Sequence, residues 1–197
     1  MSTYTGPEAA KAFTQYLEII SGESDRGAIL VAATLLDEGL EKALKKKLVE
    51  PAKQDPLFAG GFAPLRSFAA KIELSFRLGL ITRETRQMLD LFRDLRNDCA
   101  HGTDPVSLND QRLQDRMRGV FNHLAPIHAA LVITFEEILR EEKELKMTIA
   151  EFLATDRGRR AIFNTFFAVN AMALRRMELE VDRTAELTSP DQAGPTP

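Results

Sequence analysis

The chain of 197 residues carries 44% hydrophobic and 28% charged residues, a composition that can bury a core and argues against overall disorder. Its net charge of -3 argues against a protein that holds duplex DNA by neutralising phosphates, because that attraction needs a basic face. A single cysteine excludes an internal disulfide framework, and with only three histidines it argues against a zinc site. We therefore expect neither a metal nor any other cofactor.

The expected location is the cytoplasm. The longest apolar run, Ala28 to Leu36, is too short to span a bilayer. Residues 1–10 lack the basic and apolar parts of a secretion signal. The local basic clusters, including Arg157, Arg159 and Arg160, are interpreted as solvated helix faces or helix ends.

Apolar residues recur at helical spacing along nearly the whole chain, and no alternating strand pattern is evident. A first helix is expected over residues 7–20. Ser24 or Asp25 then caps a longer helix that ends near Leu48. One face of this second helix carries the apolar stripe Ile29, Ala33, Leu36, Leu40 and Leu44.

A loop follows the second helix, since residues 50–64 hold three prolines and a pair of glycines. We expect three apolar side chains of this loop to fold back onto the core: Leu57, Phe58 and Phe62. A third helix is expected over 64–78, with Gly79 as its left-handed stop. Its apolar stripe is Leu65, Phe68, Ile72 and Phe76.

Thr82 can cap a fourth helix over 83–100, with the buried stripe Met88, Phe92, Leu95 and Cys99. Its place in this stripe makes Cys99 a small core residue rather than a reactive thiol. A long helix begins near Ser107, and Pro126 must kink or restart it. The helical pattern on either side of that proline is carried by Leu113, Met117, Val120, Leu124, Leu131, Phe135 and Ile138.

Thr148 and Glu151 have the spacing of a capping box at the head of a short segment. The last helix is expected over 157–184, and its predicted buried side chains are Ile162, Phe166, Val169, Ala173 and Met177. Residues 185–197 are polar and contain prolines, which favours a disordered tail. The prediction is an all-α protein, a single helical-bundle domain of six to seven helices over residues 1–184.

The fourth helix ends in the polar motif RDLRNDCAH, residues 93–101. At about 100° per residue, Arg93, Asn97 and His101 stack on the side away from the apolar stripe, and Arg96 lies at its boundary. A structural interpretation is that a histidine in the last turn suits the negative end of a helix. A chemical one is that an arginine holds a phosphate while a histidine moves a proton of a ribose hydroxyl, which could cut RNA without a metal.

The motif Arg-Asn-x-x-x-His near a helix end resembles the signature of HEPN domains, all-helical modules that often dimerise and include metal-independent ribonucleases. A broader resemblance covers residues 23–102. The segments ESDRGAILVAATLLDEGLEKAL (23–44), LFAGGFAPLRSFAAKIELSFRLGLI (57–81) and FRDLRNDCAH (92–101) together look like the mannitol operon repressor family, MtlR.

The MtlR resemblance implies a cytoplasmic, helical bacterial regulator, linked in its namesake to repression of mannitol uptake genes. The residues that match the shared pattern are Ser24, Asp25, Arg26, Asp37, Glu38, Lys71, Arg96, Asn97 and His101. Cys99 departs from the pattern, because an aromatic residue is more usual there. The arginine-rich last helix has no counterpart that we can place.

We favour a repressor-type transcriptional regulator that works through a protein partner, forms a homodimer and is not an enzyme. No helix-turn-helix with a basic second helix is evident, so direct reading of DNA bases is not expected. Apolar residues left over from the stripes serve either an interface or a thick core: Val132, Phe163 and Phe167.

Two alternatives stay open. In an HEPN-type ribonuclease or RNA-binding module, Arg96 would hold phosphate, His101 would be the general acid or base, and Asn97 would orient it. In a purely structural interpretation Asp25 caps the second helix, and the rest form ion pairs or solvated surface: Arg26, Asp37, Glu38 and Lys71. The functional interpretations require the side chains at 96, 97 and 101 to converge near Asp37.

Overall fold

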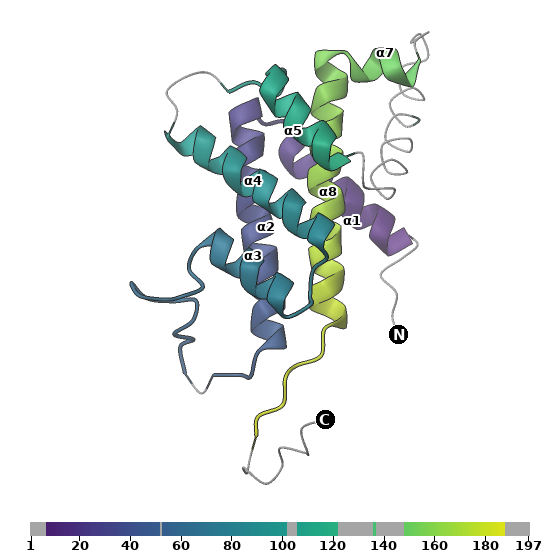
Figure 1. Cartoon of the computed structure of the whole chain (residues 1–197). Helices are drawn as coiled ribbons and strands as arrows, with labels where there is room; N and C mark the ends of the chain where they lie inside the picture. The colour runs from purple at the N-terminus through teal and green to yellow at the C-terminus, as the bar shows by residue number, and fades with distance from the viewer. Residues whose placement is uncertain (1–6, 52, 102–105, 122–135, 137–147, 188–197) are drawn as a thin grey trace.

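The structure is a computed structural model that describes residues 7–51, 53–101, 106–121, 136 and 148–187, without the side chains at 101, 118–121 and 149–150. These residues form helices and no strand, which confirms the all-α prediction (Figure 1). The helices are α1 (Pro7–Ser21), α2 (Asp25–Lys47), α3 (Phe68–Arg77), α4 (Arg83–His101), α5 (Gln111–Phe121), α7 (Ile149–Leu153) and α8 (Asp156–Glu180). Within these ranges, none of the helices has both the length and the hydropathy needed to cross a bilayer.

Helices α2 and α8 lie side by side along the long axis of the molecule, and α4 crosses in front of them (Figure 1). Helix α1 packs against α8, while α3 contacts both α2 and α4. The predicted stripe of α2 is fully buried, and the stripe of α4 from Met88 to Cys99 is buried as well. The core therefore lies between α2, α4 and α8, where the apolar faces of three helices meet.

Local caps set the helix ends, and they move two predicted boundaries. Helix α3 begins at Phe68 rather than at 64, because the hydroxyl of Ser67 accepts a hydrogen bond from the amide of Ala70 at 3.1 Å. Helix α8 ends at Glu180 rather than at 184. Beyond it the chain is extended, and the amide of Thr184 donates to the carbonyl of Lys47 at 2.7 Å.

Other predicted caps are confirmed. Gly79 has a φ of +67° at the end of α3, the left-handed conformation that glycine adopts without strain. The hydroxyl of Thr82 accepts from the amide of Thr85 at 3.2 Å. In the capping box at the start of α7, the amide of Thr148 donates to Glu151 at 2.7 Å, and the amide of Glu151 donates back to Thr148 at 3.3 Å.

The prediction for the loop between α2 and α3 is mostly wrong. Only Phe58 folds back, and it joins Leu44 and Leu65 in a small apolar cluster. Leu57 is 37% exposed and Phe62 is fully exposed, at 104%. A hydrogen bond from the amide of Leu65 to the carbonyl of Leu57 closes the loop at its base, where Phe58 and Leu65 pack against Leu44. The residues between them lie farther from the core.

The predicted stripe of α8 is also shifted. Ala173 is exposed, whereas Phe163 and Phe167 are buried in the core together with the predicted Phe166. Helix α8 touches α1, α2 and α7, so it buries more than one face. Phe163 meets Phe92 of α4 at 5.5 Å between ring centroids, and Phe167 meets Tyr16 of α1 at 5.8 Å.

Several predictions lie outside the described residues: the kink at Pro126, the side chains of Val120, Leu124, Leu131, Val132, Phe135 and Ile138, and the tail beyond residue 187. The helix predicted from Ser107 is described from Gln111 to Phe121. It begins there because the Asp110 carboxylate accepts from the amides of Arg112 and Leu113, at 2.8 and 3.2 Å.

Candidate functional site

A buried lysine joins α2 to α3. Lys71 is only 4% exposed, and its Nζ donates to Asp37 Oδ1 at 2.8 Å and to Glu41 Oε2 at 2.7 Å. Asp37 and Glu41 are one turn apart on α2, so both face the first turn of α3, where Lys71 stands. A buried ammonium is costly unless it is paired and hydrogen-bonded, and the two carboxylates supply both.

The charges of this cluster shift the pKa of two of its members. Burial by itself would raise the pKa of Glu41, but hydrogen bonds from Lys45 and Lys71 and their charges outweigh it, so the pKa lies below its usual value. For Lys71, burial would lower the pKa, yet the hydrogen bonds and charges of Asp37 and Glu41 raise it. Glu41 and Lys71 are therefore both held in their charged forms at neutral pH.

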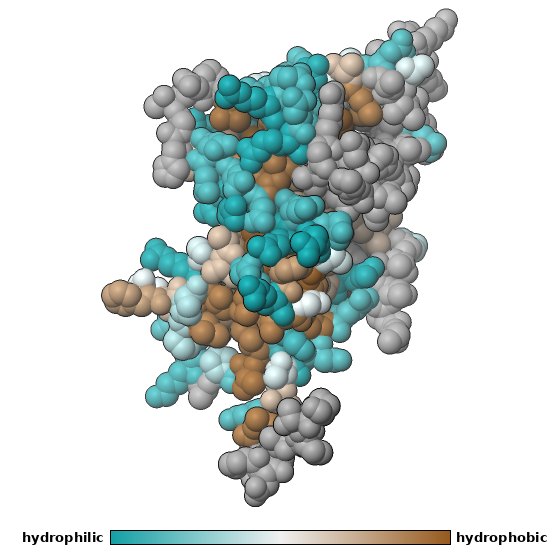
Figure 2. All heavy atoms as spheres, in the orientation of Figure 1, coloured by the Kyte–Doolittle hydropathy of each residue, from teal (hydrophilic) through white to brown (hydrophobic). Residues whose placement is uncertain are grey.

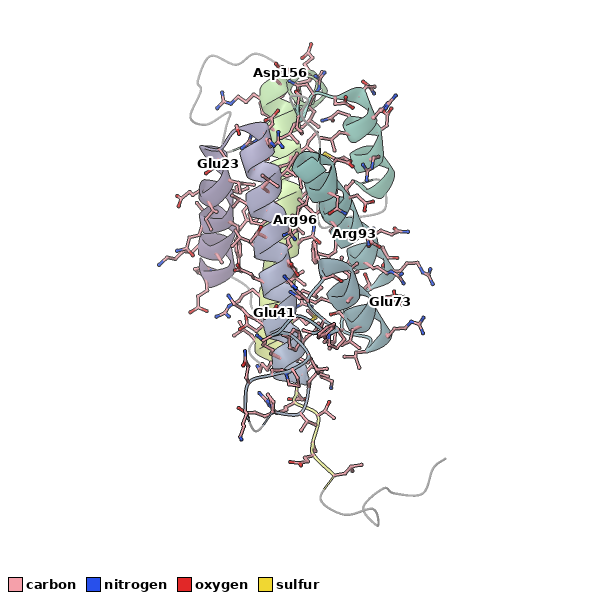
Figure 3. The ribbon with its side chains drawn as sticks, turned by 90° about the vertical axis from the view of Figure 1, so that its left-hand side faces the viewer. Glu23, Glu41, Glu73, Arg93, Arg96 and Asp156 are labelled. Atoms are coloured by element: carbon pink, nitrogen blue, oxygen red, sulfur yellow. The ribbon has the colours of Figure 1, made fainter. Side chains whose placement is uncertain are left out.

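Arg96 brings α4 into the same cluster. Its Nη1 lies 3.6 Å from Asp37 Oδ2, which is an ion pair but longer than a short hydrogen bond. The side chain of Arg96 remains 42% exposed. Figure 3 shows Arg96 between α4 and α2, whereas Arg93 lies farther toward the outer side of α4. Asp37 thus connects a buried lysine on one side with an accessible arginine on the other.

An open hollow of about 580 Å³ lies beside this cluster. Its apolar lining comes from the loop before α3 and from the starts and ends of helices: Ala63, Pro64, Phe68, Ala69 and Ala100. Its polar lining is Asp37, Arg66, Ser67, Arg93, Arg96 and Asn97. Four residues of the motif on α4 therefore line the same hollow: Arg93, Arg96, Asn97 and Ala100.

Arg93 takes part in a second set of ion pairs on the exposed side of α4. It pairs with Asp90 at 2.5 Å and with Asp94 at 2.7 Å. Arg116 of α5 approaches Asp94 at 3.1 Å and Asp98 at 3.3 Å. Because these side chains are all partly or largely exposed, we attribute to them the alignment of α4 with α5 rather than chemistry.

The other predicted site residues lie elsewhere. Ser24, not Asp25, caps α2, since its hydroxyl accepts from the amide of Gly27 at 3.1 Å. The Asp25 carboxylate instead accepts from Arg160 Nη1 at 2.8 Å and from the amide of Leu108 at 2.7 Å. The structural prediction that Asp25 caps the helix is therefore wrong, because a better acceptor precedes it and its own carboxylate faces α8.

Arg26 contacts the end of α4, where its guanidinium donates to the carbonyl of Cys99. Cys99 itself is 1% exposed, and burial raises the pKa of its thiol, as Asp98 also does, while Arg26 opposes this. The expectation that Cys99 is a buried core residue is confirmed. Glu38 is exposed on α2 and forms no ion pair with another described residue.

The predicted residues thus fall into two groups. Asp37, Lys71 and Arg96 come together, and Asn97 lies beside them at the hollow. Asp25 and Arg26 belong to contacts near the ends of α2 and α4. The backbone of His101 ends α4, but its side chain lies outside the described residues.

Sequence reasoning missed three residues. Glu41 could have been found, because it follows Asp37 by four positions on the same helix face. Arg66 had no signal, since it stands in a loop. Arg160 was predicted as solvated, yet it also donates to the carbonyls of Ile20 and Glu23, at 2.6 and 2.9 Å. Among the described side chains, no group of acids, histidines and cysteines has the arrangement of a metal site.

Comparison with known proteins places the fold. No family model matches the sequence, and no curated protein matches it either. The structure is similar to that of the MtlR-HPr complex from Escherichia coli, with a TM-score of 0.53. The match covers 85% of this chain and 99% of that chain at 17% sequence identity. The chain has an MtlR-like fold.

The resemblance to MtlR predicted from residues 23–102 is therefore confirmed at the level of the fold. The MtlR-like arrangement of helices is what brings residues 37, 71 and 96 together, although they lie on three different helices. At 17% identity the similarity describes the architecture, and the chemistry of the hollow has to be argued from the residues of this chain.

Proposed function

We propose that this protein is a cytoplasmic, MtlR-like transcriptional regulator of the repressor type, which acts by binding a protein partner. The observation that carries the proposal is the similarity of its fold to MtlR, which was solved in complex with HPr. HPr is therefore the first candidate partner. Homodimerisation belongs to the same proposal, as does the absence of direct base reading, which suits a chain with a net charge of -3.

The geometry of the Lys71 cluster supports binding over catalysis. Its carboxylates are already neutralised by lysine and arginine side chains at 2.6 to 3.6 Å. A general acid or base near neutral pH needs a pKa moved toward 7, whereas the pKa of Glu41 is moved away from it. Carboxylates that are already paired, beside an open hollow, are better suited to position a binding surface than to transfer protons.

The test is a calorimetric titration of the purified protein with HPr, together with a gel-shift assay on operator DNA. We expect saturable binding of HPr and no tight, sequence-specific binding of DNA by the protein alone. Absence of HPr binding would remove the proposed partner. Tight and salt-sensitive DNA binding that depends on sequence would overturn the proposed mode of action.

A second candidate is the HEPN-type ribonuclease or RNA-binding module. It is favoured by one observation, that Arg96 and Asn97 of the motif line the same open hollow. In that case His101→Ala should abolish cleavage of a labelled RNA while circular dichroism stays unchanged. Equal cleavage by the wild type and by the His101→Ala variant would eliminate this candidate.

A further inference from the structure

The loop between α2 and α3 holds an aromatic side chain out in the solvent. Phe62 stands at its tip, directly after the glycine pair, and Gly60 has a φ of +104°. In Figure 1 this loop projects from the body of the molecule, and Figure 2 shows hydrophobic residues at the projecting tip. Single exposed apolar residues are common on protein surfaces, so the exposure of Phe62 alone does not indicate a binding site.

A second feature of the loop is that its base is anchored to the body of the protein. The amide of Leu65 donates to the carbonyl of Leu57 at 2.8 Å, which closes the loop at its base. The amide of Leu57 donates to the Asp55 carboxylate at 3.0 Å, and Phe58 and Leu65 are both buried beside α2. Because its base is bonded and packed, the loop presents Phe62 in a preorganised way, which lowers the entropic cost of docking.

The hollow begins at the next residues of the same loop. Ala63 and Pro64 line it, together with Arg66, Arg96 and Asn97. We refer to Phe62, Ala63, Pro64, Arg66, Arg96 and Asn97 as the Phe62 surface. An apolar tip and an apolar lining therefore stand next to two accessible arginines.

The charge of the Phe62 surface is opposite to that of the whole chain. Among the residues that line its hollow, three arginines (Arg66, Arg93 and Arg96) stand against one carboxylate (Asp37), so two positive charges are left over. The chain as a whole has a net charge of -3. Arg66 is exposed and forms no ion pair with another described residue. This local excess would attract an anionic partner and orient it.

We propose that the Phe62 surface docks an acidic segment of a protein partner that also carries apolar side chains. The apolar side chains would cover Phe62, and the carboxylates would face Arg66 and Arg96. A second copy of this chain is disfavoured, because a two-fold interface would bring two positive hollows together. RNA is disfavoured as well, since a groove for a single strand normally offers a longer track of cations.

The proposal goes beyond the binding of HPr, because it concerns the chemistry of a docking surface and not the identity of one partner. The probe is a fluorescein-labelled peptide in which glutamates flank a pair of leucines, titrated with the full chain and followed by anisotropy. We expect Phe62→Ala and Arg66→Glu each to weaken binding, on the order of ten-fold or more. Raising the salt concentration should weaken binding by the wild type too.

Matched control variants come from other parts of the molecule. Leu187→Ala removes another exposed apolar side chain, 70% exposed, and Arg176→Glu reverses another exposed arginine, whose side chain is 61% exposed. Both controls should bind the peptide like the wild type. A peptide with lysines in place of the glutamates should not bind. Circular dichroism checks that Phe62→Ala and Arg66→Glu keep the helical fold.

The proposal would be overturned if the wild type did not bind the acidic peptide, or if both surface variants bound it as tightly as the wild type. It would also be overturned if the protein bound a single-stranded oligouridylate in a way that depends on Phe62. Loss of a dimer on Phe62→Ala, seen by analytical ultracentrifugation, would overturn it as well. A titration of the same variants with HPr keeps the two questions apart. Failure of the wild type to bind HPr counts against the proposed function alone.

Discussion

At the scale of single residues, Lys71 shows how a charge can be kept inside a small helical protein. Its ammonium is nearly fully buried, but two carboxylates on adjacent turns of α2 accept its hydrogen bonds. The side chains of Asp37 and Glu41 are themselves 16% and 28% exposed, so the cluster lies at the edge of the core rather than at its centre. Through the ion pair of Asp37 with Arg96, the cluster also reaches one wall of the hollow.

Removal of this lysine should therefore destabilise the protein. In Lys71→Ala, Asp37 and Glu41 would face each other on one helix face without their shared cation. We expect a loss of about 2–4 kcal/mol in the free energy of unfolding, measured by urea denaturation. Lys42→Ala, which removes an exposed lysine of the same helix α2, should change it by less than about 0.5 kcal/mol. Equal effects of the two variants would show that the buried pairing contributes nothing.

The lowered pKa of Glu41 predicts that the free energy of unfolding depends on pH. Its pKa in the folded protein lies below the value of 4.5 that it has when unpaired. A carboxyl with a lowered pKa stabilises the folded state above pH 4.5, and this contribution is lost as the pH falls through the folded pKa. Stability curves of the wild type and Glu41→Gln should therefore differ most at neutral pH and converge in acid. A gap between the curves that widens below pH 4.5 would contradict this assignment.

At the scale of elements, the corner between α7 and α8 is the tightest approach of backbone to backbone around any described glycine. Gly158 lies in the first turn of α8, and a Cβ at this position would stand 2.0 Å from the carbonyl oxygen of Phe152. Thr155 caps α8 at the same corner by accepting from the amide of Gly158 at 3.0 Å. The short helix can fold over the start of α8 only because this residue has no side chain.

Gly158→Ala should therefore cost about 1–3 kcal/mol of stability, because the backbone of α7 has to move. Gly39→Ala is the matched control. It lies in the interior of α2, and its new Cβ would meet the side chain of Leu174 at 3.5 Å, an ordinary contact. For Gly39→Ala we expect the free energy of unfolding to rise by up to about 1 kcal/mol, because alanine has a better helix propensity than glycine. Thermal unfolding followed by circular dichroism measures both, and a stabilising Gly158→Ala would refute the tight corner.

At the scale of the whole molecule, Arg160 connects segments that are far apart in the chain. It pairs with Asp25 at the start of α2 and donates to the carbonyls of Ile20 and Glu23 at the end of α1 and just after it. Asp25 in turn accepts from the amide of Leu108 before α5. One arginine of α8 thus contacts the end of α1 and the start of α2 directly, and the segment before α5 through Asp25.

A double-mutant cycle tests this connection. Arg160→Ala and Asp25→Ala should be coupled by about 1–2 kcal/mol, because their side chains are only 18% and 29% exposed and share partners. The pair Arg77 and Glu73, whose side chains are 76% and 41% exposed, is the control and should give about 0.5 kcal/mol or less. If both cycles give the same small coupling energy, the contacts of Arg160 do not connect these segments energetically.

Much of the helical framework could be predicted because it rests on local rules. The stripes of α2 and α4, the left-handed Gly79 and the Thr148–Glu151 box all depend on residues within about one or two helical turns of each other. The partial site at Asp37, Lys71 and Arg96 was reached through the residues that match the MtlR pattern. Their distances to one another had no local signal, since they lie on three different helices.

By itself, the sequence determined that the chain is all-helical, where most helices begin and end, and which faces of α2 and α4 are buried. Only the tertiary structure decided that Phe163 and Phe167 belong to the core and that the side chain of Phe62 is exposed to solvent. It also decided that Arg160 pairs with Asp25 instead of being solvated. The physical reason is that periodicity and capping act between neighbours in the chain. Burial and pairing depend on which surfaces meet after the helices have packed.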